Sequence, residues 1–227
     1  MLQQKESPRR RQPLGLHDAV QLRFEPKLTL DEYLSQEAWV SATLMRCPID
    51  GEGCRPRRHG CYWRKYPQPV PIARFYCARA RTTFSLLPDC LSSRYRGELG
   101  EFEQVCAASE SADALSVCNA VRPVENAISI SARAAERWVA RRCALLTLML
   151  RALLGVALEH VQGVHTATQL RARLGRPEAL VALREIVAAN LSSLPPPLGF
   201  GPWPSALQHT QKRAPHAMAP EPKPPSG

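Results

Sequence analysis

The stretch from Cys47 to Pro88 restricts the fold of this chain more than any other part of the sequence. It holds four closely spaced cysteines, Cys47, Cys54, Cys61 and Cys77. Such spacing is typical of two ligand-bearing turns joined by a β-hairpin. In the second turn, the position three residues after Cys77 would normally carry a ligand, and it holds Ala80 instead. The sequence therefore predicts a small hairpin subdomain over residues 46–95 with an incomplete ligand set.

Prolines place the two strands of this hairpin. Tyr62–Arg64 and Arg74–Tyr76 are rich in aromatic residues, which favours strands. Pro67, Pro69 and Pro71 lie between them. Proline cannot donate a hydrogen bond to a β-ladder, so these positions favour a loop between the strands.

The four cysteines are candidate ligands for a structural zinc ion. Zinc prefers four thiolate and imidazole donors in a tetrahedral array, and Cys61 or the neighbouring His59 would supply the fourth. Six residues separate Cys47 from Cys54, which is wider than the usual two to four. The alternative is a subdomain that keeps its fold without metal. Its aromatic side chains would then hold it together: Tyr62, Trp63, Phe75, Tyr76 and Phe84.

The rest of the ordered chain favours helices. Thr29 and Glu32 have the spacing of a capping box, which predicts a helix over residues 29–45. Residues 97–194 contain few glycines and prolines and many alanines, leucines and arginines, which predicts a helical domain. Its expected helices include a long one that begins after an N-cap at Ser131 and runs toward His160, and one over Ala167–Leu174. The predicted fold class is therefore mainly α: a helical bundle with a helix-turn-helix-like element, plus the small N-terminal hairpin subdomain.

Both ends of the chain are expected to be disordered. Residues 1–28 form a polar, basic arm with the run Arg9–Arg11, and residues 195–227 form a tail with ten of the 21 prolines. The N-terminal residues contain no apolar signal segment, so a cytoplasmic location is expected. Arg151 interrupts the apolar run 143–161, which favours a buried helix over a membrane span.

The charge balance favours a polyanionic partner. Lys and Arg number 30 against 20 Asp and Glu, giving a net charge of +10. Residues 111–142 are predicted to form a helix-turn-helix-like segment, in which Arg133, Arg137 and Arg141 recur every four residues on one helix face. Stacked like charges repel, and a DNA phosphate would relieve that repulsion. The candidate DNA-binding residues are Arg133, Arg137, Arg141 and Arg142 on this helix, and Arg57, Arg58, Arg64 and Lys65 on the hairpin.

Five segments carry a resemblance to a known family. Cys47-Pro48 with His59–Arg64, Ile72–Cys77 and Thr82–Asp89 together resemble the N-terminal zinc-ribbon domain of bacterial transposase-like proteins. Residues 134–142 resemble the helix-turn-helix that often accompanies it. The resemblance implies DNA binding in the context of a mobile element, with metal ligands at Cys47, Cys54 and Cys77.

The favoured function is non-catalytic binding of double-stranded DNA. The sequence contains no phosphate-binding glycine loop or nucleophile elbow, and its acidic residues fall mainly on predicted helix surfaces, so no enzyme is expected. The alternative is a protein-interaction module whose apolar helices around Leu145–Leu158 pack against a partner or a second copy of the chain. In neither case is a membrane role expected.

Overall fold

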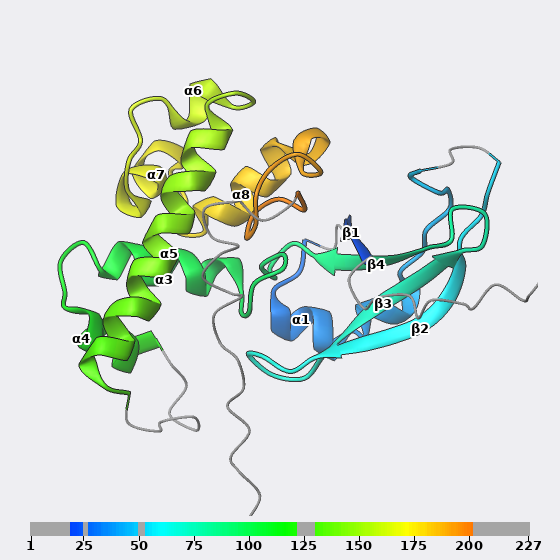
Figure 1. The fold of residues 1–227 in the computed structure, drawn as a ribbon, viewed down its shortest axis with the longest axis horizontal. Coiled ribbons are helices and arrows are strands. Elements are labelled where there is room, and N and C mark those ends of the chain that lie inside the picture. The colour runs from blue at the N-terminus through cyan, green and yellow to red at the C-terminus, as the bar shows by residue number, and fades with distance from the viewer. Residues whose placement is uncertain (1–18, 25–26, 50–52, 122–129, 202–227) are drawn as a thin grey trace, which may run out of the picture. The chain divides into compact units, whose positions relative to one another are not determined.

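A computed structural model of the protein describes residues 19–24, 27–49, 53–121 and 130–201 (Figure 1). The chain divides into two compact units, which we call the sheet unit (up to Leu91) and the helical unit (from Ser92). Helix makes up 43% and strand 18%, and the strands form one four-stranded mixed sheet. The fold is α/β, so the prediction of a mainly α fold is wrong. The sequence prediction recognised one hairpin and missed the two strands that extend it.

The sheet has the strand order β1-β4-β3-β2. The predicted hairpin consists of β2 (Arg57–Arg64) and β3 (Val70–Cys77), which pair antiparallel. β4 (Thr82–Pro88) continues the antiparallel arrangement, and β1 (Ala19–Phe24) pairs with β4 in parallel. β3 and β4 are central and largely buried, whereas the edge strand β2 is mostly exposed.

β1 lies within the segment that was predicted to be a disordered arm. Its apolar residues alternate, and Val20, Leu22 and Phe24 pack against the core of the sheet unit. The guanidinium of Arg23 forms a two-pronged ion pair with the carboxylate of Asp89, with an Nη2–Oδ2 distance of 2.8 Å. β1 forms within a polar part of the sequence because the sheet supplies both its hydrogen bonds and its apolar contacts. The Arg9–Arg11 run lies outside the described residues.

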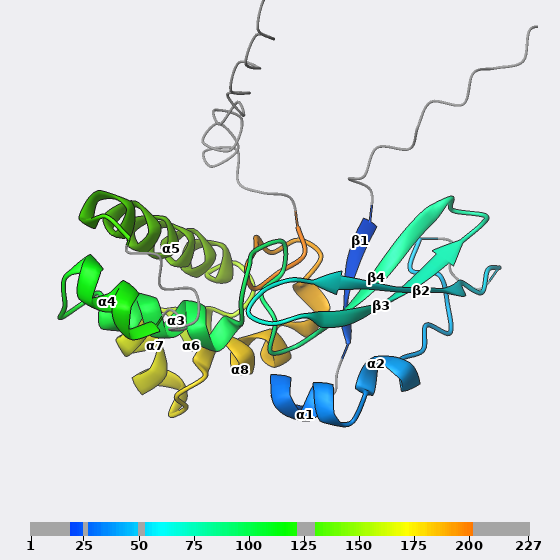
Figure 2. The ribbon, with the colours of Figure 1, turned by 90° about the horizontal axis from the view of Figure 1, so that it is seen from below.

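Two short helices, α1 (Leu30–Ser35) and α2 (Ala38–Ser41), cover one face of the sheet (Figure 2). The predicted capping box is confirmed: the Thr29 hydroxyl accepts from the Glu32 N–H, and the Glu32 carboxylate accepts from the Thr29 N–H. The predicted single helix over 29–45 is wrong. Glu37 adopts a left-handed conformation with φ of 47°, which breaks the helix.

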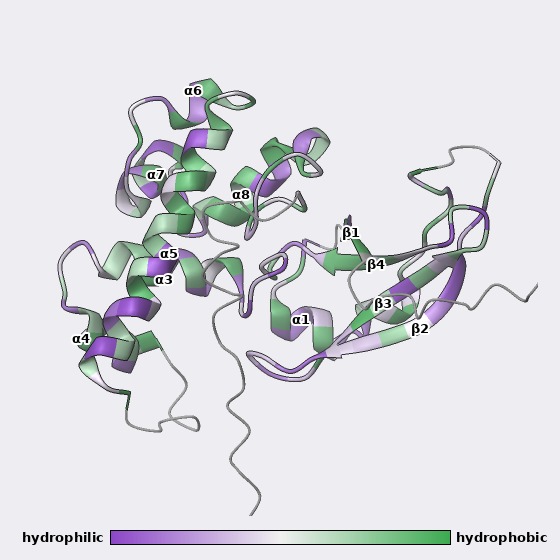
Figure 3. Cartoon of the chain, viewed as in Figure 1, coloured by the Kyte–Doolittle hydropathy of each residue, from purple (hydrophilic) through white to green (hydrophobic). Residues whose placement is uncertain are grey.

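The helical unit follows the predicted pattern more closely. Its helices are α3 (Leu99–Ala108), α4 (Ala114–Val121), α5 (Ala132–Leu153), α6 (Leu158–Val161), α7 (Ala167–Leu174) and α8 (Ala179–Ile186), followed by a 3-10 turn at Ala188–Asn190. Hydrophilic residues are frequent in the N-terminal half of α5, while its C-terminal half is mostly apolar (Figure 3). In the part of the chain that the structure describes, no helix has the length and apolar character needed to cross a membrane.

The proline-rich tail predicted from residue 195 does not begin there. Residues 196–201 are buried, and the side chain of Arg184 on α8 donates to the carbonyl oxygens of Leu198 and Pro197 at 3.0 and 2.8 Å. The Ser93 N–H donates to the same Pro197 oxygen at 2.8 Å. Because partners within the unit satisfy these carbonyl groups, a proline-rich segment can be part of a core. Residues from 202 onward lie outside the described part of the chain.

Candidate metal centre

Three thiols gather at one end of the sheet unit. The Sγ atoms of Cys47, Cys54 and Cys77 all lie within 4.8 Å of one another. Cys47 and Cys77 are buried and Cys54 is half-buried, and the Cys47 N–H donates to the Cys54 carbonyl at 3.2 Å. A Zn–S bond of about 2.3 Å puts the sulfurs of a tetrahedral site about 3.8 Å apart, so a small closing movement would let these thiols share one ion. We call these three residues the cysteine trio.

The turn between β3 and β4 is shaped like a ligand-bearing turn but lacks its second ligand. The Ala80 N–H donates to Sγ of Cys77 at 3.2 Å. Arg81 has a φ of 52°, the left-handed conformation that closes the turn. Ala80 packs against the apolar cluster that contains Cys47 and Cys77. Ala80, at the position where a fourth ligand would be expected, therefore lies beside the trio. Its methyl side chain offers no donor atom.

Hydrogen bonds within the trio favour a thiolate at Cys77. Burial opposes ionisation of this thiol, but hydrogen bonds from the Cys54 thiol, the Ala80 N–H and the Cys47 thiol outweigh burial, so the pKa of Cys77 lies below its ordinary value. The pKa of Cys54 is correspondingly raised to about 11, first by its hydrogen bond to Cys77 and then by burial. The thiolate is the form that binds metal, so Cys77 is the natural first ligand of the trio.

Cys61, the fourth predicted ligand, is not part of this group. It lies in β2 opposite Ala73, and its side chain is exposed. His59, the other candidate, also lies in β2, where its ring is 6.0 Å from that of Tyr76. The structure thus brings together three of the four predicted cysteines. Soft sulfur donors in this number could bind a metal ion.

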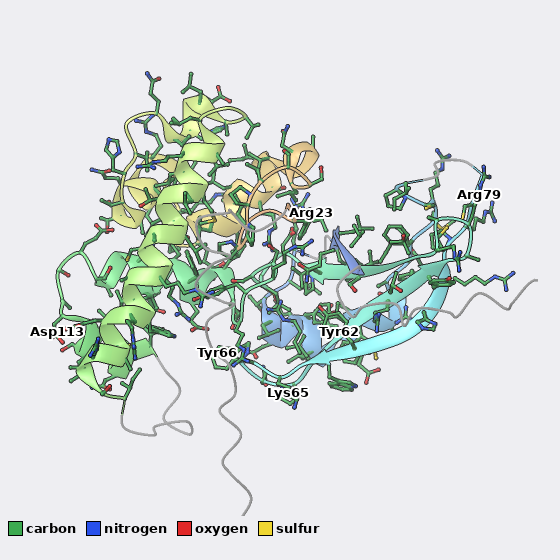
Figure 4. All side chains as sticks on the ribbon, viewed as in Figure 1. Arg23, Tyr62, Lys65, Tyr66, Arg79 and Asp113 are labelled. Carbon is green, nitrogen blue, oxygen red and sulfur yellow. The ribbon has the colours of Figure 1, made fainter. Side chains whose placement is uncertain are left out.

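Arginines stand beside every cysteine of the trio, a pattern that the sequence analysis missed. Besides Arg58, which donates to carbonyl oxygens in and after α2, five exposed arginines lie within four residues of a trio cysteine: Arg46, Arg55, Arg57, Arg79 and Arg81. Figure 4 shows Arg79 at this end of the sheet unit, with Lys65 and Tyr66 at the opposite end. The guanidinium groups of Arg55, Arg57 and Arg81 form no hydrogen bond or ion pair with any described residue. We call these three the cysteine-end arginines.

The predicted DNA-binding residues of the hairpin occupy different environments. Arg57 is exposed beside the trio, whereas Lys65 is exposed at the far end of β2. Arg58 donates to the carbonyl oxygens of three residues in and after α2, at 2.6 to 3.2 Å: Trp39, Val40 and Ala42. Arg64 is half-buried, and burial lowers the pKa of its guanidinium. Arg58 therefore ties α2 to the sheet, and of the four only Arg57 is both near a trio cysteine and without a described partner for its guanidinium.

The predicted arginine row on α5 is divided between surface and interior. Arg133 and Arg137 are exposed. Arg141 is half-buried, and its guanidinium lies 5.9 Å from the centre of the Tyr95 ring. Arg142 is only 4% exposed. A continuous charged face on α5 is therefore absent among the described residues, and the connection 122–129 of the helix-turn-helix-like segment lies outside them.

Arg142 has partners within the helical unit. Its guanidinium lies 3.4 Å from the centre of the Trp138 ring and 5.2 Å from that of Tyr95. Its Nη2 atom is 3.8 Å from a carboxylate oxygen of Glu101 on α3. Stacking on an indole ring and a nearby carboxylate stabilise a buried guanidinium. This side chain joins α5 to α3, so it is not available to contact a phosphate.

Comparisons with known proteins leave the chain without an assigned family. No family model, no curated protein and no solved structure matches it.

Proposed function

We propose that the cysteine trio holds a structural zinc ion. Thiolate sulfur is a preferred donor for zinc, and the N–H···S hydrogen bond from Ala80 orients Cys77 as a ligand. Cys47, Cys54 and Cys77 would bind the ion, and since Ala80 offers no donor, water would complete the tetrahedron. The ion would join the segment between α2 and β2, which holds Cys47 and Cys54, to the end of β3, which holds Cys77.

We further propose that the protein is a non-catalytic DNA-binding protein of transposase-like origin, and that it contacts DNA with the trio end of the sheet unit. The cysteine-end arginines carry this proposal. They are three exposed cations close in sequence to the trio, and no described carboxylate neutralises them. Their mutual repulsion would fall on contact with a phosphate backbone, which also releases counterions. The net charge of +10 acts in the same direction.

Removing the cysteine-end arginines should weaken DNA binding and its salt dependence. In an Arg55→Ala, Arg57→Ala, Arg81→Ala variant, three phosphate contacts are lost, so the slope of log K against log salt should become shallower by about 2.7. Fluorescence anisotropy with a labelled duplex of mixed sequence, at several ionic strengths, measures this slope.

A matched control removes the same charge from the other unit. Arg133→Ala, Arg137→Ala, Arg151→Ala takes three exposed arginines from α5 and should leave the slope nearly unchanged. Equal losses in both variants would show that binding follows net charge alone. A larger loss in the α5 variant would move the contact to the helical unit and contradict the proposed surface.

A second candidate function, a protein-interaction module, rests on an exposed apolar segment after α5. Leu154, Val156 and Leu158 are 45%, 40% and 52% exposed, which is high for three large apolar side chains in one short segment. The residues that precede them on α5, such as Leu145 and Met149, are buried within the unit. Within the predicted segment Leu145–Leu158, the exposed apolar surface is therefore confined to the end of α5 and the start of α6.

Serine at these three positions tests the second candidate. If the segment joins two copies of the chain, the wild type should elute with a mass above that of the 25.2 kDa chain, and Leu154→Ser, Val156→Ser, Leu158→Ser should restore the single-chain mass. Light scattering after size exclusion, at two salt concentrations, gives the mass directly. A wild type of single-chain mass at all concentrations would remove self-association from consideration.

A further inference from the structure

Two cysteines of the helical unit, distant from the trio in sequence, form a hydrogen-bonded thiol pair. Cys106 lies on α3 and Cys143 on α5. Their side chains are joined by a hydrogen bond. The Ser109 hydroxyl lies 3.2 Å from Sγ of Cys143 and 2.8 Å from the carbonyl oxygen of Cys106. This hydroxyl therefore fixes Cys143 against the turn of α3 that begins at Cys106.

The two thiols differ in their acidity. The hydrogen bond from Cys106 lowers the pKa of Cys143 to about 6, against an opposing effect of burial, and Ser109 lowers it further. The pKa of Cys106 is raised by the same hydrogen bond and by burial. The two opposite shifts favour the thiolate on Cys143 and the proton on Cys106. This is the arrangement of an attacking sulfur beside a resolving thiol.

Access also distinguishes the two sulfurs. Cys143 is half-buried, whereas Cys106 is buried, so Cys143 is the more exposed residue of the pair. Cys118 of α4 belongs to the same apolar region but is fully buried. A packing role alone does not account for the hydrogen bond between Ser109 and Cys143 or for the lowered pKa of Cys143.

We propose that Cys106 and Cys143 form a peroxide-responsive redox site. The Cys143 thiolate attacks one oxygen of hydrogen peroxide and breaks the O–O bond, giving a sulfenic acid and hydroxide. The Cys106 sulfur then attacks the sulfenic sulfur, forming a disulfide, and its proton leaves with the hydroxyl group as water. Two electrons pass from the two thiols to the peroxide, and a thiol reductant reverses the step.

The disulfide would link α3 directly to α5. The bond closes a loop that includes α4 and the connection 122–129, so it restricts the unfolded chain and should raise the unfolding midpoint of the helical unit. Oxidation would thus change the stability of this unit without involving the metal centre.

Peptide mapping of the full chain tests the proposal. After treatment with hydrogen peroxide and blocking of free thiols, trypsin should release peptide 97–133 joined to peptide 143–151, two hydrogens lighter than the sum of the peptides. Dithiothreitol should abolish this species. Peptide 97–133 contains both Cys106 and Cys118, so variants are needed to assign the bond.

Cys118→Ser is the matched control and should retain the cross-link, whereas Cys106→Ser should lose it and accumulate a dimedone-reactive sulfenic acid at Cys143. In the untreated wild type at pH 7, iodoacetamide should modify Cys143 roughly threefold faster than an ordinary exposed thiol, because a larger thiolate fraction outweighs its lower nucleophilicity. Three results would overturn the proposal. The first is that no cross-link forms although other cysteines oxidise. The second is that the cross-link persists in Cys106→Ser. The third is that a non-reducing gel shows the cross-link only between two chains.

Discussion

A Cys77→Ala variant is expected to bind zinc at least about a hundredfold more weakly than the wild type, because each thiolate supplies a large share of the binding free energy of a zinc site. Cys77 is the ligand that the structure prepares best: it is buried, it accepts the Ala80 N–H, and its pKa is held below the ordinary value. Competition with a chromogenic chelator, together with native mass spectrometry, measures both affinity and stoichiometry.

The control for this prediction is Cys61→Ala, which removes an exposed thiol outside the trio and should leave zinc affinity unchanged. Ala80→Cys provides the converse test. Since the Ala80 N–H already bonds to the Cys77 sulfur, a thiol at this position completes a four-sulfur set and should tighten binding more than about tenfold. Equal weakening by Cys61→Ala and Cys77→Ala, or no effect of Ala80→Cys, would contradict the site described here.

An Arg184→Ala variant is expected to lose about 3–5 kcal/mol of stability, which is most of what a small domain has. The side chain is 0% exposed, donates to the carbonyl oxygens of Pro197 and Leu198, and lies 5.6 Å from the centre of the Phe200 ring. Truncation leaves two buried carbonyl oxygens without this donor and opens a cavity. The melting temperature of the helical unit should fall by about 10 °C or more, as measured by circular dichroism at 222 nm.

Two further variants separate the causes. Arg184→Met keeps most of the volume but none of the donors, so it should recover only the part of the loss that comes from packing. Arg176→Ala removes an exposed arginine that lies between α7 and α8, and it should change stability by less than about 0.5 kcal/mol. A wild-type melting curve for Arg184→Ala would mean that residues 196–201 do not contribute to the core.

Local signals predicted two helix caps and the bounds of one helix correctly. The capping hydroxyl of Thr29 and the N-cap of α5 at Ser131 lie where the sequence placed them, because a cap is recognised by residues within one turn. α7 has the predicted bounds, Ala167–Leu174, and Gly175 ends it with a φ of 63°. The helix predicted to run from Ser131 toward His160 was too long, because α5 ends at Leu153. The period of the apolar residues does not show where neighbouring helices stop covering a helix.

Strand partners explain most of the errors in the sheet unit. Val20, Leu22 and Phe24 alternate in the manner of a strand, but β1 exists only because β4 offers a parallel edge more than sixty residues away. A pairing of that range leaves no local mark in the sequence. The same limit applies to Arg142. Its charge led the sequence analysis to predict a phosphate contact, but in the structure its guanidinium packs against the rings of Trp138 and Tyr95.

The sequence by itself determined the composition of the candidate centre: cysteines at 47, 54 and 77, an alanine in place of a fourth donor at 80, and a surplus of arginine. Only the tertiary structure decided which thiols meet, that Cys61 stays apart, and that Arg58 and Arg142 bind partners within the protein. The physical reason is that residue identity fixes the chemistry a side chain can perform. Its partners, burial and charge state are instead set by residues that folding brings close from distant parts of the chain.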